Sequence, residues 1–339
     1  MAQFVPRRTF VAPNSIPKTY YLGHHAAGHS KMVKEINRVN LVLECRDARI
    51  PLTSQNPTLE RTIAGRERLI IYTKSDFTSH SPHAMNALRK MYGDRVVFWD
   101  KMRPTTTLHL LKKIKDSARA HDSLVGLRVM VVGVPNVGKS SLLNSLRFKG
   151  IPSKTAKVAK TGSQAGITRK ISTNVRILPP ESKKGGVGQN GAFVLDTPGI
   201  FQPYVNDGET MLKIALVQGI KDGLIQDEVL ADYLLYQINL FKPALYEKYC
   251  GPTNDLDEFL SAVASKEGML KAGGVPDLRT AATRVLSLWR KGELGRFVLD
   301  DLSDKGLEEH QQHVLNPPLS MNQAKKQKRE ARAQEKAGA

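Results

Sequence analysis

The sequence has 339 residues, 40% hydrophobic and 24% charged, a composition typical of soluble globular proteins that excludes disordered, collagen-like and disulfide-rich chains. Its 51 Lys and Arg against 32 Asp and Glu give a net charge of +19, which favours a polyanionic partner, most often RNA. The alternative is a well-solvated basic surface. Two cysteines without a C-x-x-C pair predict no metal site of that kind, and no apolar run is long enough to span a membrane.

The N-terminal 34 residues carry five Lys and Arg and no Asp or Glu. An acid-free start with hydroxyl residues and no apolar h-region is typical of a mitochondrial transit segment. Residues 1–22 are therefore predicted to be a basic targeting segment, with the mitochondrial matrix as the location. The alternative is an arm that docks on nucleic acid, because Pro6, Pro13 and Pro17 interrupt the helix of a transit peptide. Charge alone also allows peripheral contact with the matrix side of the inner membrane.

Short apolar runs and helical patterns alternate over the next part of the chain. The runs 39–44, 69–72, 96–99 and 127–132 predict strands, and the patterns at 83–92 and 107–119 predict helices between them. Two further strand-like runs, 170–178 and 192–195, flank the stretch PPESKKGGVGQNG, which is predicted to be a surface excursion. The alternation predicts an α/β fold with a mostly parallel sheet of about six strands.

The P-loop pattern G-x-x-x-x-G-K-[ST] lies at residues 133–140, between the run 127–132 and a helix carrying Leu142, Leu143 and Leu146. In such a loop, backbone amides and the helix N-terminus bind phosphates. The predicted phosphate-binding residues are Asn136, Val137, Gly138, Lys139, Ser140 and Ser141. We expect Lys139 to reach the β- and γ-phosphates as a catalytic residue and Ser140 to ligate Mg²⁺.

Two segments after the P-loop are predicted to complete the metal and γ-phosphate sites. Asp196-Thr-Pro-Gly199 follows the run 192–195, so that Asp196 holds the Mg²⁺ water shell and the Gly199 amide meets the γ-phosphate. Between them, Gly166-Ile-Thr168 offers a hydroxyl as the third member of the metal site and as a catalytic switch residue. The alternative is an ordinary loop threonine.

The guanine-reading motif of a GTPase needs a carboxylate that accepts from N1–H and N2–H₂, a donor pair that adenine lacks. No N-K-x-D follows the P-loop, but Thr73-Lys-Ser-Asp76 stands upstream of it, after the run 69–72. We predict that Asp76 discriminates guanine, with Thr73 and Lys74 beside it.

After about residue 206 the apolar residues recur at helical spacing. The stripes are Leu230, Leu234, Ile238 and Phe241; Phe259, Leu260 and Val263 behind a capping box of Asp255 and Glu258; and Leu278, Ala282, Val285 and Trp289, ended by Gly292. They predict a small all-α domain over 207–320, followed by a basic tail at 321–339.

The order of base motif, P-loop, switch threonine and DTPG resembles the circularly permuted GTPases of the YlqF type. The segment 41–57 is similar to that family's D-A-R-x-P region and Gly23-His-His25 to its G-H-M. Segments 273–277 and 290–296 are similar to its C-terminal module. The resemblance extends from about Tyr20 to Leu299. It implies a circularly permuted GTPase domain over 23–206 and a role in assembly of the large ribosomal subunit, which the basic start assigns to the mitochondrion.

The resemblance also implies residue roles and exposes departures. Ile200 stands where Ras-like enzymes have a glutamine, so the implied catalytic side chain is His24; the alternatives are a loop histidine without a role and a fortuitous metal pair of His25 and His29. Asn136 is the implied ligand of a potassium ion, with a plain turn residue as the alternative. Thr73 replaces the family's Asn, and residues 97–100 do not match its second base loop.

We therefore expect a slow, monomeric GTPase that uses Mg²⁺, and K⁺ by hypothesis, and couples its GTP or GDP state to binding of the mitochondrial large ribosomal subunit and its rRNA. The predicted RNA-binding surface combines the C-terminal helices with Lys149, Lys154, Lys157, Lys160, Arg169 and Lys170. The alternative interpretation of these six basic residues is a solvated loop. The competing hypotheses are an RNA scaffold with GTP as a structural ligand, the same role on a cytosolic or nucleolar ribosome, and a P-loop ATPase.

Overall fold

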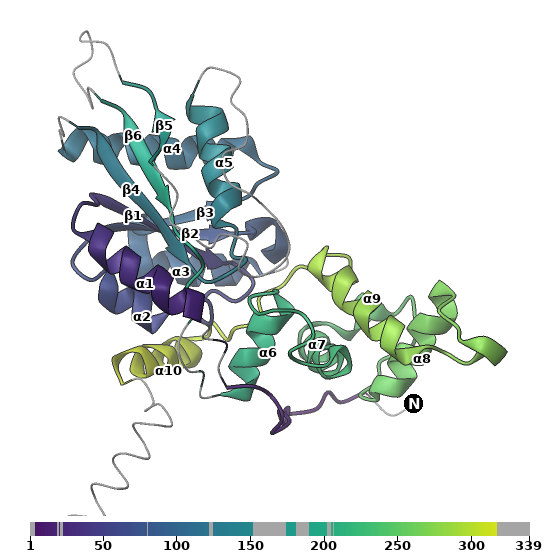
Figure 1. The fold of residues 1–339 in the computed structure, drawn as a ribbon. Helices are drawn as coiled ribbons and strands as arrows, with labels where there is room; N and C mark the ends of the chain where they lie inside the picture. The colour runs from purple at the N-terminus through teal and green to yellow at the C-terminus, as the bar shows by residue number, and fades with distance from the viewer. Residues whose placement is uncertain are drawn as a thin grey trace, which may run out of the picture.

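One part of the computed structural model is built on a six-stranded sheet (Figure 1). The structure describes residues 4–18, 20, 23–79, 81–121, 125–151, 174–180, 190–201, 205 and 207–316. The strand order is β3-β2-β1-β4-β6-β5, parallel except for β5. The strands are β1 (Leu41–Asp47), β2 (Glu67–Thr73), β3 (Val96–Trp99), β4 (Leu127–Gly133), β5 (Val175–Leu178) and β6 (Ala192–Asp196). The predicted α/β fold is confirmed. Residues 170–173 of the fifth predicted strand and 181–189 of the predicted excursion lie outside the described residues.

Helices cover both faces of the sheet, as the continuous apolar strands require. One face packs on α4 (Pro104–His121) and α5 (Lys139–Gly150). The other packs on α1 (Gly23–Ile36), α2 (Pro57–Thr62) and α3 (Pro82–Tyr92). The carboxyl ends of β1, β2, β4 and β6 meet at one edge, where a parallel α/β sheet presents its ligand-binding loops.

A separate helical core follows the sheet in the chain. It consists of α6 (Gly208–Leu216), α7 (Asp227–Phe241), α8 (Leu256–Glu267) and α9 (Leu278–Arg290). The predicted apolar stripes are buried in it except for two residues. Leu278 is partly buried, and Phe241 ends α7 at 40% exposure and stacks on Phe297. Asp255 caps α8 as predicted, but the Glu258 carboxylate accepts from the Thr253 hydroxyl instead of closing a capping box. None of the described helices has the length and apolarity needed to cross a bilayer.

The last described helix, α10 (Asp304–Leu315), leaves this helical core and lies against the sheet domain (Figure 1). Leu302 and Leu307 pack with Ile70 and Tyr72 of β2, on the face that α3 covers. Within the predicted helical domain over 207–320, α10 therefore packs on the sheet and not in the helical core, because Leu302 and Leu307 belong to the apolar core of the sheet. The predicted tail at 321–339 lies outside the described residues.

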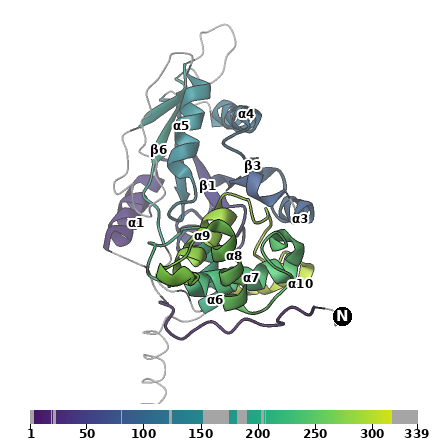
Figure 2. The ribbon, with the colours of Figure 1, turned by 90° about the vertical axis from the view of Figure 1, so that its right-hand side faces the viewer.

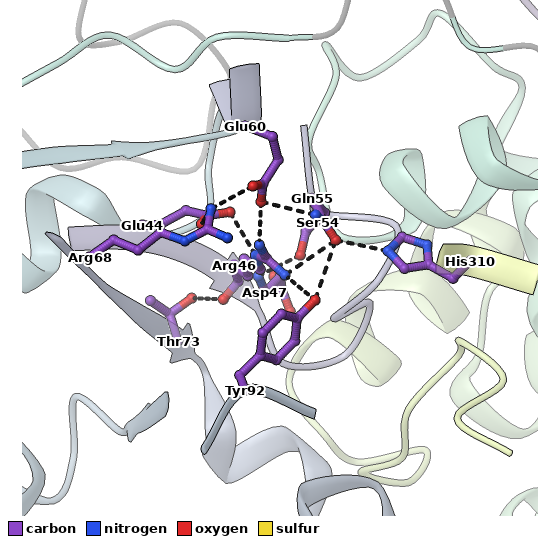
Figure 3. Close-up of polar contacts among 10 residues, drawn as sticks. All are labelled: Glu44, Arg46, Asp47, Ser54, Gln55, Glu60, Arg68, Thr73, Tyr92 and His310. Carbon is purple, nitrogen blue, oxygen red and sulfur yellow. Dashed lines mark hydrogen bonds and ion pairs between the residues drawn. The ribbon is translucent and has the colours of Figure 1, made fainter. Parts of the chain in front are cut away.

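A buried ionic network joins β1, α2 and α10 beneath the sheet (Figure 3). The Arg46 guanidinium is fully buried and donates to Glu44 and Glu60, at 2.7 Å in each case. It also approaches Gln55, whose Oε1 lies 2.8 Å from Nε2 of His310 on α10. Further contacts come from Arg68, which bridges the two carboxylates, and from the Tyr92 hydroxyl. The charges of this network are paired with one another, which is the condition under which charged groups can be buried.

The N-terminal segment runs along the helical core instead of standing apart (Figures 1 and 2). Arg7 donates to the Asp232 carboxylate at 2.6 Å, and the Phe10 ring packs edge-on against Tyr233 at 5.1 Å. Ile16 and Tyr20 are buried in the same core as α6 and α7. The described part of the predicted targeting segment is therefore an element of the fold, and its role in targeting stays a prediction.

Replacing Phe10 by Ala is expected to lower the free energy of unfolding by about 1–2 kcal/mol, because the half-buried ring loses its contacts with two tyrosines. The matched control is Val11→Ala, since Val11 is 86% exposed. Urea unfolding monitored by circular dichroism measures both. Equal stability of the two variants would contradict the packing of this segment.

Candidate functional site

The predicted P-loop leaves β4 in a conformation that glycine makes accessible. Gly133 has φ 146°, and a Cβ there would lie 2.4 Å from the carbonyl oxygen of Cys45 on β1. Gly138 precedes α5 with φ 98°, and Asn136 also adopts a positive φ, 55°. These positive φ angles turn the loop tightly before α5 begins. Backbone amides in such a turn can point into one concavity and bind phosphate.

Lys139 and Ser140, the first residues of α5, face the end of β6. The buried Lys139 ammonium donates to the carbonyl of Val134 at 2.8 Å and of Gly133 at 3.2 Å, within the loop. Burial lowers the pKa of Lys139, and the nearby Asp196 carboxylate opposes that shift. Ser140 Oγ donates to Asp196 Oδ2 at 3.1 Å. A hydroxyl beside a carboxylate is an oxygen donor set that suits Mg²⁺, which takes few protein ligands and completes its shell with water and phosphate.

The segment after β6 is fixed against the P-loop. The Thr197 hydroxyl donates to Val131 of β4 at 2.7 Å, and the Ile200 amide donates to Gly133 at 3.2 Å. A Cβ on Gly199 would lie 2.6 Å from Cα of Pro135, so this contact requires glycine. The predicted pair of Asp196 and Gly199 is thus brought to the P-loop, whereas Thr168 lies outside the described residues.

The base motif lies at the end of β2 and contacts the P-loop through Thr73. The buried Thr73 hydroxyl lies 2.5 Å from the carbonyl oxygen of Val137 and 3.1 Å from that of Arg46. It therefore ties β1, β2 and the P-loop together, and its contact with guanine stays a prediction. Lys74, with φ 56°, directs its ammonium to the Asp47 carboxylate at 2.7 Å.

Asp76 lies in a 3-10 turn (Ser75–Thr78) and is half-buried. Burial and the neighbouring carboxylate of Asp100 raise the pKa of Asp76, and Arg296 and Arg49 act in the opposite direction. Asp100 follows β3 within the segment where the resemblance implies a second base loop. A carboxylate held in this environment can accept two donors from one base edge.

The D-A-R segment contributes two residues, Asp47 and Arg49, for which no role was predicted from the sequence. Arg49 forms a bidentate pair with Asp47, at 3.0 and 2.9 Å. Burial would raise the pKa of Asp47, but the Arg49 and Lys74 cations hold it well below its usual range. The Arg49 guanidinium also lies 5.2 Å from the Trp289 ring of α9, and its carbonyl accepts from the Leu299 amide at 2.8 Å. Asp47 thus links Lys74 of the base motif, through Arg49, to the helical core. This contact joins residues far apart in the chain and cannot be predicted from a local sequence pattern.

The histidines of α1 go to different partners. His24 is the second residue of α1, and its side chain lies outside the described residues. His25 is buried with Nδ1 2.9 Å from the carbonyl oxygen of Gly199, and His29 Nε2 lies 2.9 Å from the Thr62 hydroxyl. The alternative of a His25 and His29 metal pair does not match these contacts, and the described residues contain no group of three or more metal-binding side chains.

The P-loop also contacts the helical core directly. Asn136 Nδ2 donates to the carbonyl of Gln218, which follows α6, at 2.7 Å. Arg290 of α9, one of the basic residues of the C-terminal helices, donates to Leu216 at 2.9 Å. Arg284 pairs with Glu267 at 2.6 Å. Part of the predicted basic surface therefore has an internal role, whereas Lys149 is exposed at the end of α5.

Comparison with known proteins identifies relatives of this architecture. A family model described as a 50S ribosome-binding GTPase matches residues 128–266. The chain is 34% identical to Mitochondrial GTPase 1 of Schizosaccharomyces japonicus, over 85% of this chain and 91% of that protein. It is 30% identical to Mitochondrial ribosome-associated GTPase 1 of Xenopus tropicalis, over 83% and 94%. The crystal structure of GNP-bound YlqF from T. maritima superposes with a TM-score of 0.55 at 26% identity, covering 81% of this chain and 98% of that one.

Proposed function

Since this chain belongs to the family of mitochondrial GTPases and is a GTPase with the circularly permuted YlqF-type fold, we propose that it acts in the mitochondrial matrix on assembly of the large ribosomal subunit. The observation that carries the proposal is the convergence of P-loop, DTPG segment and base motif at one sheet edge. The helical core lies beside them and contacts the P-loop at Asn136 and the D-A-R segment at Arg49. The names of the relatives and the charge of +19 support an RNA-containing partner.

In the proposed site, Lys139 and the amides of residues 136–141 bind the phosphates of GTP. Ser140 and, through water, Asp196 hold Mg²⁺, with Thr168 as the third member of the metal site. The metal, when bound, neutralises charge on the β- and γ-phosphates. Asp76 accepts from guanine, with Thr73 and Lys74 beside it, and Gly199 meets the γ-phosphate through its amide.

The attacking water needs a partner other than residue 200, because the isoleucine there neither donates nor accepts. We assign that role to His24, whose imidazole can orient water near neutral pH. We further propose that K⁺ binds at Asn136 and raises turnover. Equal rates of hydrolysis in Na⁺ and K⁺ buffers would contradict the potassium site.

The two nucleotide states are proposed to differ in the segments that contact the γ-phosphate, which order on GTP binding and relax after hydrolysis. Asn136 connects the P-loop to Gln218, and Arg49 connects the base motif to Trp289, so the helical core is placed to respond to the nucleotide. A change there alters the basic surface offered to rRNA. We expect the protein to bind the subunit in one state and leave in the other.

Sedimentation with purified mitochondrial large subunits tests the proposal. The protein is expected to pellet with the subunit in the presence of a non-hydrolysable GTP analogue and to stay in the supernatant with GDP, with binding that weakens steeply as salt rises. Identical pelleting in both nucleotides would instead favour the RNA scaffold with GTP as a structural ligand. Preference for cytosolic large subunits would move the role to another ribosome.

A further inference from the structure

The ring of His25 is enclosed beside the DTPG segment. Its side chain is buried, and Nδ1 lies 2.9 Å from the carbonyl oxygen of Gly199 and 3.4 Å from the amide nitrogen of Phe201. The nearer partner is a carbonyl, which only accepts, so Nδ1 carries the proton and donates to Gly199. We infer that His25 is a positioning residue for GTP hydrolysis, holding Gly199 in the orientation that meets the γ-phosphate. The inference rests on the proposed role of Gly199.

The peptide between Gly199 and Ile200 is held from both sides. His25 binds its carbonyl, and its N–H donates to the carbonyl of Gly133 in the P-loop at 3.2 Å. Loss of the imidazole donor would remove the hydrogen bond to this half-buried carbonyl and let the peptide plane rotate. Rotation would also break the hydrogen bond to Gly133 and would shift Gly199, whose amide is proposed to meet the γ-phosphate.

Packing keeps the imidazole in place. The ring lies 5.9 Å from Tyr20 and 6.5 Å from Phe201, centroid to centroid. One turn along α1, a Cβ on Gly28 would lie 2.8 Å from Cγ of Pro198, so the helix sits directly on the DTPG segment. His25 and Gly28 share the helix face that meets this segment, and the position of α1 sets the position of the donor.

His25 is distinct from the proposed water-orienting histidine, which precedes it in the chain. The G-H-M pattern of the resembling family has methionine at this position, and methionine has no N–H to donate. The hydrogen bond to Gly199 is therefore a feature of this chain. It assigns placement of the loop, and not proton transfer, to His25.

Two substitutions separate the donor from the volume of the ring. His25→Asn keeps an N–H at the place of Nδ1, and His25→Met keeps apolar volume without a donor. In single-turnover GTP hydrolysis we expect His25→Met to lower the rate constant by about tenfold or more, with the affinity for GDP unchanged, and His25→Asn to retain most of the wild-type rate. Wild-type hydrolysis by His25→Met, or an equal loss in both variants, would overturn the inference.

A third variant changes the position of α1, and with it the contact of His25 with Gly199, without replacing His25. Gly28→Ala should push α1 away from Pro198 and slow hydrolysis while the His25 ring itself is intact. Lys139→Ala serves as the reference for the phosphate site, and it is expected to abolish hydrolysis. Hydrolysis by Lys139→Ala would contradict the proposed site itself. If Lys139→Ala is inactive but His25→Met hydrolyses GTP at the wild-type rate, only the role of His25 is overturned.

Discussion

Replacing Asp76 by Asn is expected to lower the affinity for GDP by about 10²–10⁴-fold, since two hydrogen bonds to a charged acceptor are lost at about 1.5–3 kcal/mol each. Xanthine has a carbonyl at the position where guanine has its amino group, and the asparagine amide N–H can donate to that carbonyl. The variant should therefore prefer xanthosine diphosphate. Competition of guanosine, xanthosine and adenosine diphosphates against a fluorescent guanine nucleotide measures the change.

The matched control is Asp94→Asn, an exposed carboxylate in the turn before β3, which should bind GDP as the wild type does. The pH dependence gives a second readout. Burial and Asp100 raise the pKa of Asp76, and only the ionised carboxylate accepts both donors, so affinity for GDP should weaken as the pH falls through this raised pKa. Unchanged GDP affinity in Asp76→Asn would place guanine recognition elsewhere.

Replacing Arg46 by Met is expected to lower the free energy of unfolding by about 3–5 kcal/mol. The substitution removes a fully buried guanidinium, and Glu44 and Glu60 then lack their main partner. The loss should reach α10, since Gln55 joins Arg46 to His310. Chemical denaturation gives the free energy, and hydrogen exchange of the α10 amides reports its local effect.

Arg66→Met provides the comparison, because the Arg66 guanidinium donates to the side chain of Asn37, an exposed residue, at 2.8 Å. A change within about 0.5 kcal/mol is expected there. Adding Glu60→Gln to Arg46→Met should recover part of the lost stability by removing one uncompensated carboxylate. A small effect of Arg46→Met would mean that water reaches the network and solvates its charges.

The sequence predicted the sheet well because each strand is a short, continuous apolar run between helical patterns. The P-loop, the DTPG segment and Asp76 were identifiable because their chemistry depends on residues within a few positions of each other. Thr73 illustrates the limit of such reading. Its hydroxyl bonds to main-chain carbonyls of β1 and the P-loop, a role set by the meeting of strands far apart in the chain.

The contacts between the two parts of the molecule could not be read from local patterns. The acid-free composition of the start predicted a targeting segment, yet Arg7 and Phe10 belong to the packing of the helical core, because a basic segment with spaced apolar residues can satisfy both roles. Similarly, the placement of α10 against the sheet domain is seen in the packing of Leu307 and in the contact of His310 with Gln55. Tertiary burial, not periodicity, decides such placements.

Coupling of this GTPase to the mitochondrial large ribosomal subunit can be measured by multiple-turnover GTP hydrolysis with Mg²⁺, with and without purified subunits. Basal turnover is expected at about 10⁻³ per second or below. Subunits should raise the wild-type rate and leave Lys139→Ala at background. Subunits that bind the wild-type protein without raising its rate, or a Lys139→Ala variant that hydrolyses GTP, would contradict the account.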